Sequence, residues 1–254
     1  MTQPIRLFVG GDKREAVGLH VFIESVLDRC SLPVSLTVVN EAFSLAAGGQ
    51  RDGTNAFTYG RFLVPAMSDW TDALWMDGAD MLVRPGVDLA ELWEHCRAHS
   101  WKKAALVVKH EYESTAAQKY VGTPMAADNR SYPRKNWSSM IFWNGTHMAN
   151  RALRPSYVKL EKGDALHQFK WLDDSLLGEL PREWNWLVGE YPHNPAAKLA
   201  HFTLGIPGFT HYKDCDYADE WRAAHARASA GLQQVPAVAG GVAPAPARIR
   251  RRAA

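Results

Sequence analysis

The fold is decided by residues 5–40, which read IRLFVGGDKREAVGLHVFIESVLDRCSLPVSLTVVN. Ile5–Val9 is a short apolar run that ends at Gly10, and this pattern predicts a buried strand that opens into a loop. Apolar residues then recur at helical spacing over Glu15–Cys30, and Ser35–Asn40 predicts a second strand. A strand, a helix and a strand in this order are typical of a βαβ unit. We therefore expect an α/β fold with a mostly parallel central sheet flanked by helices.

The rest of the chain continues to alternate between short apolar runs and helical patterns. Further strands are expected at Ala73–Met76, Met81–Val83, Ala104–Val108, Ser139–Trp143, Trp184–Val188 and Ala200–Thr203. Further helices are expected at Thr58–Met67, Leu89–His99, His167–Leu180 and Tyr217–Ala230. The segments 42–55 and 113–135 lack a regular pattern, so we interpret them as loops, the second as a loop beside an active site.

The composition predicts one globular domain followed by a tail. Of the 254 residues, 46% are hydrophobic and 22% are charged, which is typical of a chain that buries a core. Residues 231–254 are mostly Ala, Pro, Gly and Val with four Arg, so we expect a domain over 1–230 and a disordered tail over 231–254. Those arginines more than account for the net charge of +2, and a chain so balanced is not expected to be a dedicated nucleic-acid binder.

Cysteine usage and hydropathy predict a cytoplasmic protein. The three cysteines, Cys30, Cys96 and Cys215, are odd in number and have no CxxC spacing, which argues against a disulfide scaffold and fits a reducing compartment. No apolar run approaches the length of about 18 residues that a membrane-spanning helix needs. The first residues lack a basic segment followed by a long apolar one, so no signal peptide is expected.

Two aspartates follow one of the expected strands. Residues 74–83 read LWMDGADMLV, so Asp77 and Asp80 lie between two apolar runs. Ligands of an open α/β sheet bind outside the carboxyl ends of its strands. Carboxylate oxygens suit Mg²⁺ or Mn²⁺, and such ions usually bridge to phosphates. The pattern therefore points to a metal–diphosphate site, although the same residues would also suit a polar turn.

Other polar residues extend this hypothesis. His201 precedes a glycine in the run AHFTLG and is a candidate further ligand, or a hydrogen-bonded core histidine. Arg61 lies between aromatic residues and is suited to clamp phosphate, or is an ordinary surface arginine of a helix. The amide and hydroxyls of residues 136–139 are suited to hydrogen-bond a polyol. Asp173 and Asp174 form a carboxylate pair that suits acid–base chemistry or sugar binding, or a solvated helix face.

Several common nucleotide and hydrolase motifs are absent. The sequence has no GxxxxGK[ST] phosphate loop and no GxGxxG after the first strand. It also has no GxSxG nucleophile elbow. These absences argue against a P-loop nucleotidase, a dinucleotide-dependent dehydrogenase and an α/β-hydrolase.

Taken in order along the chain, the motifs resemble glycosyltransferase family 8. The resemblance covers roughly residues 5–220, and it is most similar to a bacterial and phage branch of glycosyltransferase-like proteins. It rests on the strand before Asp12, Tyr59–Arg61, MDGADMLV at 76–83, Trp143–Gly145, WLDD at 171–174, LPREWN at 180–185 and HFTLG at 201–205. It implies a GT-A fold, a UDP-sugar donor, a Mn²⁺ or Mg²⁺ ion, and transfer with retention of anomeric configuration.

The resemblance also implies roles for individual residues. Asp77 and Asp80 match the metal-binding aspartates of the family, and His201 matches its late metal-ligating histidine. Other residues match positions that contact the donor: Asp12 the uridine, Arg61 the phosphate or sugar, and Asn144 the donor sugar. Asp173 and Asp174 fall where the family places a polar segment beside the anomeric carbon, and Asp173 is the expected stabiliser of the reacting sugar.

Two departures from the family pattern bear on these roles. The family has one residue between its aspartates, whereas Gly78 and Ala79 both intervene here, so both carboxylates reach one ion only if the chain bends, as Gly78 would allow. The family also has a lysine shortly after the late histidine, and this chain has none. Lys109, Arg61 and Lys213 are the candidates to neutralise the diphosphate in its place, unless the metal ion fills that role alone.

The sequence thus predicts a metal-dependent glycosyltransferase that moves a hexose from a UDP-sugar to an acceptor hydroxyl. Two alternatives stay open: a sugar nucleotidyltransferase, and a non-catalytic protein that binds a nucleotide sugar or a glycan. The acceptor is left open among a glycan, a lipid-linked sugar, a protein and modified DNA.

Overall fold

The first forty residues form the expected βαβ unit. The structure, a computed structural model, describes residues 3–40 and 55–230. Strand β1 (Ile5–Gly10) leads through helix α1 (Ala16–Asp28) to strand β2 (Val34–Val39). The two strands pair in parallel from Ile5 opposite Val34 to Gly10 opposite Val39. The expected tail and almost all of the expected loop 42–55 lie outside the described residues.

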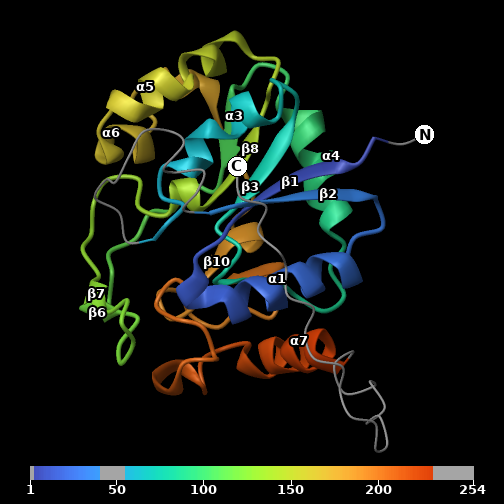
Figure 1. The fold of residues 1–254 in the computed structure, drawn as a ribbon, viewed down its shortest axis with the longest axis vertical. Helices are drawn as coiled ribbons and strands as arrows, with labels where there is room; N and C mark the ends of the chain where they lie inside the picture. Colours follow the sequence, from blue (N-terminus) through green and yellow to red (C-terminus); the bar gives the residue numbers. More distant parts are fainter. Residues whose placement is uncertain (1–2, 41–54, 231–254) are drawn as a thin grey trace, which may run out of the picture.

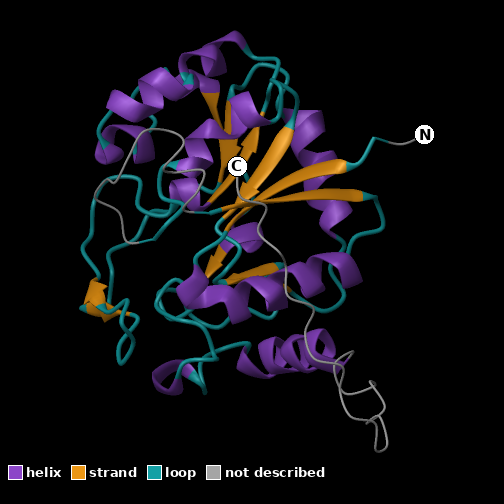
Figure 2. Ribbon diagram, in the orientation of Figure 1, coloured by secondary structure: helices purple, strands orange, loops and turns teal. Residues whose placement is uncertain are grey.

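The central sheet has six strands in the order β2-β1-β3-β8-β5-β9 (Figure 2). The added strands are β3 (Ala73–Met76), β5 (Ala105–Val107), β8 (Met140–Trp143) and β9 (Leu177–Glu179). Strand β8 pairs antiparallel with β3 and with β5, while the other neighbouring pairs are parallel. The sheet is therefore mostly parallel, as expected, with one reversed strand in its middle.

Two small sheets complete the strand content of the described residues. The first has the order β10-β11-β4, formed by β4 (Met81–Val83), β10 (Trp186–Leu187) and β11 (Leu199–His201). The second pairs β6 (Gln118–Lys119) with β7 (Ala127–Asp128), inside the segment expected to be a loop. The first of them matters for function because it continues directly from the Asp77–Asp80 turn.

Helices cover both faces of the central sheet, as Figure 1 shows. Because side chains alternate along a strand, Leu74 and Met76 of β3 pack on one face, against α1 and α4 (Leu89–His99). Trp75 of the same strand packs on the other face. That face is covered by η2 (Gly60–Leu63), α3 (Val64–Met67), α5 (Pro155–Leu160) and α6 (Gly163–His167). The core is thus split into two layers by the sheet.

The last described helix, α7 (Ala218–Ala230), packs against α1 on its outer side (Figure 1). Trp221 of α7 joins a third apolar cluster with Leu82 and Ala200 of the small sheet and Val21 of α1. No helix among the described residues is long and apolar enough to cross a membrane.

The expected helix over His167–Leu180 is wrong. Helix α6 ends at His167, Phe169 takes a left-handed backbone conformation, and residues 177–179 form the edge strand β9. Leu172, Leu176 and Leu180 recur every four residues, which imitates a helical face, but Leu177 and Gly178 are needed to pair with β5. At Gly178 a Cβ atom would lie 2.2 Å from a methyl group of Leu106, so a larger residue there would require Leu106 to shift.

Candidate active site

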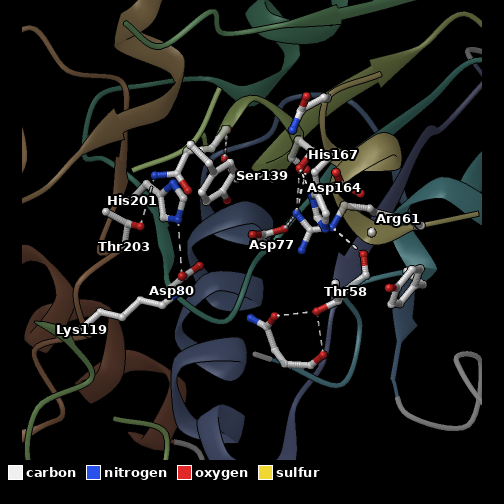
Figure 3. A pocket seen from close by; sticks show the side chains of 18 of the residues that line it. Thr58, Arg61, Asp77, Asp80, Lys119, Ser139, Asp164, His167, His201 and Thr203 are labelled. Atoms are coloured by element: carbon white, nitrogen blue, oxygen red, sulfur yellow. Dashed lines mark hydrogen bonds and ion pairs between the residues drawn. The ribbon is translucent and has the colours of Figure 1, made fainter. Parts of the chain in front are cut away.

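Four of the expected site residues line one cavity of 710 Å³ (Figure 3). Asp77 directly follows β3, Asp80 directly precedes β4, His201 ends β11, and Arg61 lies in η2. The cavity thus opens where β3 ends and where the small sheet begins. Polar side chains converge there from segments that are far apart in the sequence.

A tight turn at Gly78 directs both aspartates into this cavity. Gly78 has a φ of +72°, and the carbonyl oxygens of Asp77 and Gly78 accept hydrogen bonds from Ala79 N at 2.8 Å and Met81 N at 3.0 Å. The bend that the aspartate spacing required is therefore confirmed at Gly78. Helix α1 packs closely on this turn, since a Cβ at Gly18 would lie 2.0 Å from the carbonyl oxygen of Ala79.

Asp77 is held by a buried arginine. Arg61 Nη1 lies 2.9 Å from Asp77 Oδ1, and the indole nitrogen of Trp75 donates to the same oxygen at 3.0 Å. Burial raises the pKa of Asp77 to about 6, although the nearby Arg61 guanidinium acts in the opposite direction. Arg61 is only 4% exposed, so it is not a surface arginine, and its Nη1 also donates to the Ser138 carbonyl at 2.8 Å.

Asp80 faces His201 across a short gap. His201 Nε2 lies 3.4 Å from Asp80 Oδ2, and its Nδ1 lies 2.9 Å from Asn185 Oδ1. The other oxygen of Asp80 is buried and has no hydrogen-bond partner among the described residues. An unpaired buried carboxylate oxygen is costly, so this atom is suited to interact with a bound ligand.

The donor atoms at this gap fit a divalent cation. Two carboxylates and an imidazole are ligands that Mn²⁺ accepts. Among residues 3–40 and 55–230, no group of three or more His, Cys, Asp or Glu side chains is arranged to hold a metal ion by itself. Since Asp77 Oδ1 is already engaged by Arg61, Asp80 and His201 are the side chains that would hold such an ion, and a bound diphosphate would complete the shell.

Sequence reasoning missed the lysine of this cavity, Lys119. It comes from β6, in the segment 113–135 that we interpreted as a loop beside an active site, and Figure 3 shows its side chain near Asp80. Burial lowers the pKa of Lys119, while the carboxylates of Asp80, Asp77 and Glu15 oppose that change. No local pattern marked this residue, because the segment around it has no periodicity.

The segment 113–135 forms a wall of the cavity and is anchored by a buried polar network. Lys135 Nζ donates to Ser114 Oγ and, at 2.6 Å, to Asn129 Oδ1. The amide of Asn129 donates in turn to Glu190 Oε1 at 2.8 Å. Tyr120 and Tyr132 of this segment also line the cavity.

Glu15 is a second feature that the sequence did not reveal. It lies at the end of η1 (Lys13–Glu15), directly before α1, and is 2% exposed. Neither of its carboxylate oxygens has a hydrogen-bond partner among the described residues. Burial, together with the neighbouring carboxylates of Asp80, Asp12 and Asp77, raises its pKa to about 8. The Glu15 carboxyl is therefore mostly uncharged at neutral pH.

The structure does not bring Asn144 to the cavity. Because β8 runs antiparallel, its last residue pairs with Ala73 at the start of β3, and Asn144 lies at the opposite end of the sheet from Asp77. Its amide donates to the carbonyls of Ser100 at 3.0 Å and Lys103 at 2.9 Å. The residues before β8 reach the site instead, since Asn136, Ser138 and Ser139 line the cavity.

Four other expected residues also lie outside the cavity lining. Asp12 caps η1 and binds Arg14 and the amide of Ala56, and Lys109 lies over the Trp137 ring. Asp173 is exposed and accepts from Ser175 N at 2.8 Å, while Asp174 pairs with Arg134 at 2.6 Å. Asp173 and Asp174 do not reach the cavity because the expected helix over His167–Leu180, which would have carried them, is not formed.

Over 230 residues, the chain is 34% identical to Protein CDI of Arabidopsis thaliana, with 86% of this chain and 85% of that protein covered. The chain belongs to the Protein CDI family. This relative is a plant protein, whereas the sequence resemblance was to a bacterial and phage branch. A scan against models of protein families finds no match.

Solved structures place the CDI-family chain in the GT-A fold. It matches the apo structure of WbbM, a bifunctional glycosyltransferase, with a TM-score of 0.60 and 15% identity over 92% of this chain. It matches GlyE of Streptococcus pneumoniae with a TM-score of 0.58 and 13% identity over 88%. The chain spans 51% of the WbbM chain and 60% of the GlyE chain. At these identities the likeness establishes the fold.

A third structure matches over nearly the whole length of both chains. The galactosyltransferase LgtC, in complex with donor and acceptor sugar analogs, has a TM-score of 0.51 and 14% identity, with 88% of this chain and 96% of that chain covered. The match shows that the CDI-family chain has the elements of a GT-A domain.

Proposed function

We propose that the protein is a glycosyltransferase of the family 8 type, which transfers a hexose from a UDP-sugar to an acceptor hydroxyl with retention. The observation that carries this proposal is the meeting of Asp77, Asp80 and His201 in one cavity of a GT-A fold. The fold supports nucleotide-sugar chemistry by analogy, because ligands of such sheets bind at the carboxyl ends of the strands.

A divalent cation, Mn²⁺ or Mg²⁺, is part of this proposal. Asp80 and His201 would hold it, with Asp77 beside them, and when bound it neutralises charge on the departing diphosphate. Arg61 keeps Asp77 in place through the 2.9 Å ion pair, and its own charge lies beside the cavity. The cation, once bound, and the fixed Arg61 guanidinium would supply positive charge near the point where negative charge develops.

Lys119 is our candidate for the positive charge that the family places after its late histidine. Lys109 lies outside the cavity lining, and Lys213 is 65% exposed and 3.9 Å from Asp214. Among the described residues, two lysines line the cavity: Lys119, and Lys162, which directly precedes α6. The Lys119 amine is therefore suited to bind a diphosphate oxygen on the side opposite Arg61.

The remaining walls carry groups that suit a sugar. Asn136, Ser138 and Ser139 line one side, and Asp164 and Gln168 line another. Hydroxyls, amides and carboxylates of this kind hydrogen-bond sugar hydroxyl groups. Because Asp173 and Asp174 lie outside this lining, their expected catalytic role stays a prediction without support from the geometry.

The decisive experiment measures metal and donor binding in one variant series. Wild type, Asp80→Asn and the exposed control Asp214→Asn are heated with Mn²⁺ and a panel of UDP-sugars, and donor hydrolysis is then followed by UDP release. A ligand that binds only the folded state raises its melting temperature. We expect Mn²⁺ and the donor to raise the melting temperature of wild type and of the control. In Asp80→Asn we expect donor turnover to fall at least tenfold.

Other outcomes of the same experiment select the alternatives. Pyrophosphate release from UTP and a sugar phosphate would identify a nucleotidyltransferase. A melting-temperature shift without turnover of any UDP-sugar would identify a non-catalytic binding protein. Turnover that survives Asp80→Asn unchanged would overturn the metal assignment.

We propose a glycan hydroxyl as the acceptor and the cytoplasm as the place of action. LgtC was solved with donor and acceptor sugar analogs, and the sugar-binding groups of this cavity extend beyond the cation end. An acceptor screen that compares free glycans, lipid-linked sugars, protein and glucosylated DNA tests this proposal, and transfer to a class other than a glycan would contradict it.

A further inference from the structure

We propose that Asn185 and Ser139 are positioning residues that hold His201 in a single tautomer, with the proton on Nδ1 and the electron pair of Nε2 directed at Asp80. This inference rests on the proposed function, because it concerns the residues behind the cation ligands. It is carried by a chain of hydrogen bonds whose direction can be deduced from its far end.

This series of hydrogen bonds begins at the main-chain carbonyl of Asn136. Ser139 Oγ lies 2.7 Å from the carbonyl oxygen of Asn136, and a carbonyl only accepts, so the serine hydroxyl is the donor. A hydroxyl has one proton, so Ser139 Oγ must act as the acceptor toward its other neighbour. That neighbour is Asn185 Nδ2, which donates at 2.8 Å.

This order fixes the amide of Asn185 and then the imidazole. With its NH₂ group toward Ser139, Asn185 presents its carbonyl oxygen Oδ1 to His201 Nδ1 at 2.9 Å. Because that oxygen only accepts, the Nδ1 atom of His201 must carry a proton. In a neutral imidazole, Nε2 is then an unprotonated acceptor.

Water cannot readily substitute for any member of this chain. Asn185 is 0% exposed, and Ser139 and His201 are each 2% exposed. Leaving any of these buried polar groups unpaired would cost free energy, so the order of donors and acceptors is strongly favoured.

The result is a site prepared for a positive charge. Nε2 of His201 faces Asp80 Oδ2 at 3.4 Å, and Asp80 Oδ1 is buried without a hydrogen-bond partner among the described residues. A cation between them would be bound by both side chains. Metal-ligating histidines commonly donate their other N–H to a fixed acceptor, and here Asn185 provides it.

Ser139 connects both halves of the site. Its main-chain carbonyl accepts a hydrogen bond from Asp77 N at 2.9 Å, while its side chain begins the chain to His201. Asn185 ends η6 (Arg182–Asn185), directly before β10, which pairs with β11 so that Leu187 lies opposite His201. The positioning groups thus come from elements that flank each cation ligand.

The first test reads the tautomer directly. Long-range ¹H–¹⁵N spectra of the metal-free full chain, labelled with ¹⁵N-histidine, distinguish the protonation of the two ring nitrogens, and His201→Gln assigns the signal. We expect a proton on Nδ1 and none on Nε2. A neutral ring with its proton on Nε2, or a ring protonated on both nitrogens, would overturn the proposal.

The second test changes the acceptor. Asn185→Asp keeps an oxygen for Nδ1, so we expect the same tautomer and a Mn²⁺ dissociation constant within about threefold of wild type. Asn185→Leu removes the acceptor, so we expect Nε2 to gain the proton and Mn²⁺ binding, measured by electron paramagnetic resonance, to weaken about 10- to 100-fold.

A matched control separates positioning from folding. Asn150 is also 0% exposed, but its amide donates to the carbonyls of Ala104 and Asn144, away from the cavity. Asn150→Leu should therefore lower the melting temperature without changing the His201 tautomer or the Mn²⁺ affinity of the folded protein. An equal loss of Mn²⁺ affinity in Asn150→Leu and Asn185→Leu would contradict the proposal.

The two proposals fail in different ways. If His201 has the expected tautomer but wild type does not bind Mn²⁺, the positioning chain stands and the metal-dependent function falls. If Mn²⁺ binds and Asn185→Leu retains both the Nδ1 proton and full affinity, the positioning role falls and the metal site stands. Should Asn185→Leu not fold, the wild-type spectrum and Asn185→Asp still decide the outcome.

Discussion

Single carboxyl groups in this protein owe their properties to burial. Glu15 and Asp77 both have raised pKa values, about 8 and about 6, because the folded chain removes water from them. They differ in their partners, since Arg61 compensates Asp77 while the oxygens of Glu15 have no hydrogen-bond partner among the described residues. Glu15 is therefore the residue at which pH should act most clearly on stability.

We predict that Glu15→Gln stabilises the metal-free protein at pH 8 and has little effect at pH 4.5. The folded pKa of about 8 lies above the ordinary value of 4.5, so the folded state binds the proton more tightly. Its contribution is complete below pH 4.5 and is lost as the pH rises toward 8, at up to about 1.4 kcal/mol per pH unit.

Urea unfolding in EDTA at the two pH values measures this difference in the free energy of unfolding. The control is Glu179→Gln, at an exposed position on the edge strand β9, which should change little at either pH. An equal effect of Glu15→Gln at both pH values would show that the carboxyl titrates normally.

We predict that Lys119→Met weakens binding of UDP with Mn²⁺ by about tenfold or more, because it removes a charge-assisted contact with the diphosphate. Lys119→Arg should retain affinity within about threefold, and uridine, which lacks phosphate, should bind all three proteins alike. Calorimetric titration gives these constants, with the exposed Lys213→Met as control. Unchanged UDP affinity in Lys119→Met would remove Lys119 from the site.

At the scale of elements, the direction of strand β8 explains why one expected site residue, Asn144, lies away from the cavity. The rule that ligands bind at the carboxyl ends of strands led us to the Asp77–Asp80 turn, and both aspartates line the cavity. The role of Asn144 was implied by the family resemblance instead. Because β8 is antiparallel, its first residues lie at the cavity edge of the sheet and Asn144 lies at the opposite edge. Strand direction depends on pairing between distant segments, which the local pattern of a short apolar run does not contain.

The Gly78 turn is the element that most directly shapes the site. We predict that Gly78→Ala lowers Mn²⁺ affinity at least tenfold, since its φ of +72° is strained for alanine and its Cβ would lie 3.2 Å from Val9 Cβ. Gly86 is the matched control, with a φ of +78° and no atom within 4 Å of the Cβ position. Both variants should lose about 1–2 kcal/mol of stability.

Melting temperature and Mn²⁺ titration together test this prediction. Gly86→Ala should lose stability without losing Mn²⁺ affinity, because Gly86 lies outside the cavity lining. If Gly78→Ala binds Mn²⁺ as wild type does, the turn geometry does not control the cation ligands.

At the scale of the whole molecule, the sequence predicted the architecture well. Periodicity placed β3, β4 and α4 at their observed bounds, because each is a short segment whose burial follows directly from its own residues. It failed over residues 167–180, where leucines four apart imitate a helix and pairing with β5 decides the outcome. The motifs LPREWN and HFTLG contain Asn185 and His201, but their contact and the place of Lys119 depend on tertiary proximity, which no sequence pattern marked.

The small sheet has a consequence for how such a protein can diversify. Met81 lies opposite His201 in the β4–β11 pairing, and Phe202 N donates to the Asp80 carbonyl at 2.7 Å, so main-chain bonds set the spacing of Asp80 and His201. Other walls of the cavity come from segment 113–135 and the α5–α6 corner. Descendants of this chain can therefore exchange one substrate preference for another through those walls while inheriting the same catalytic centre.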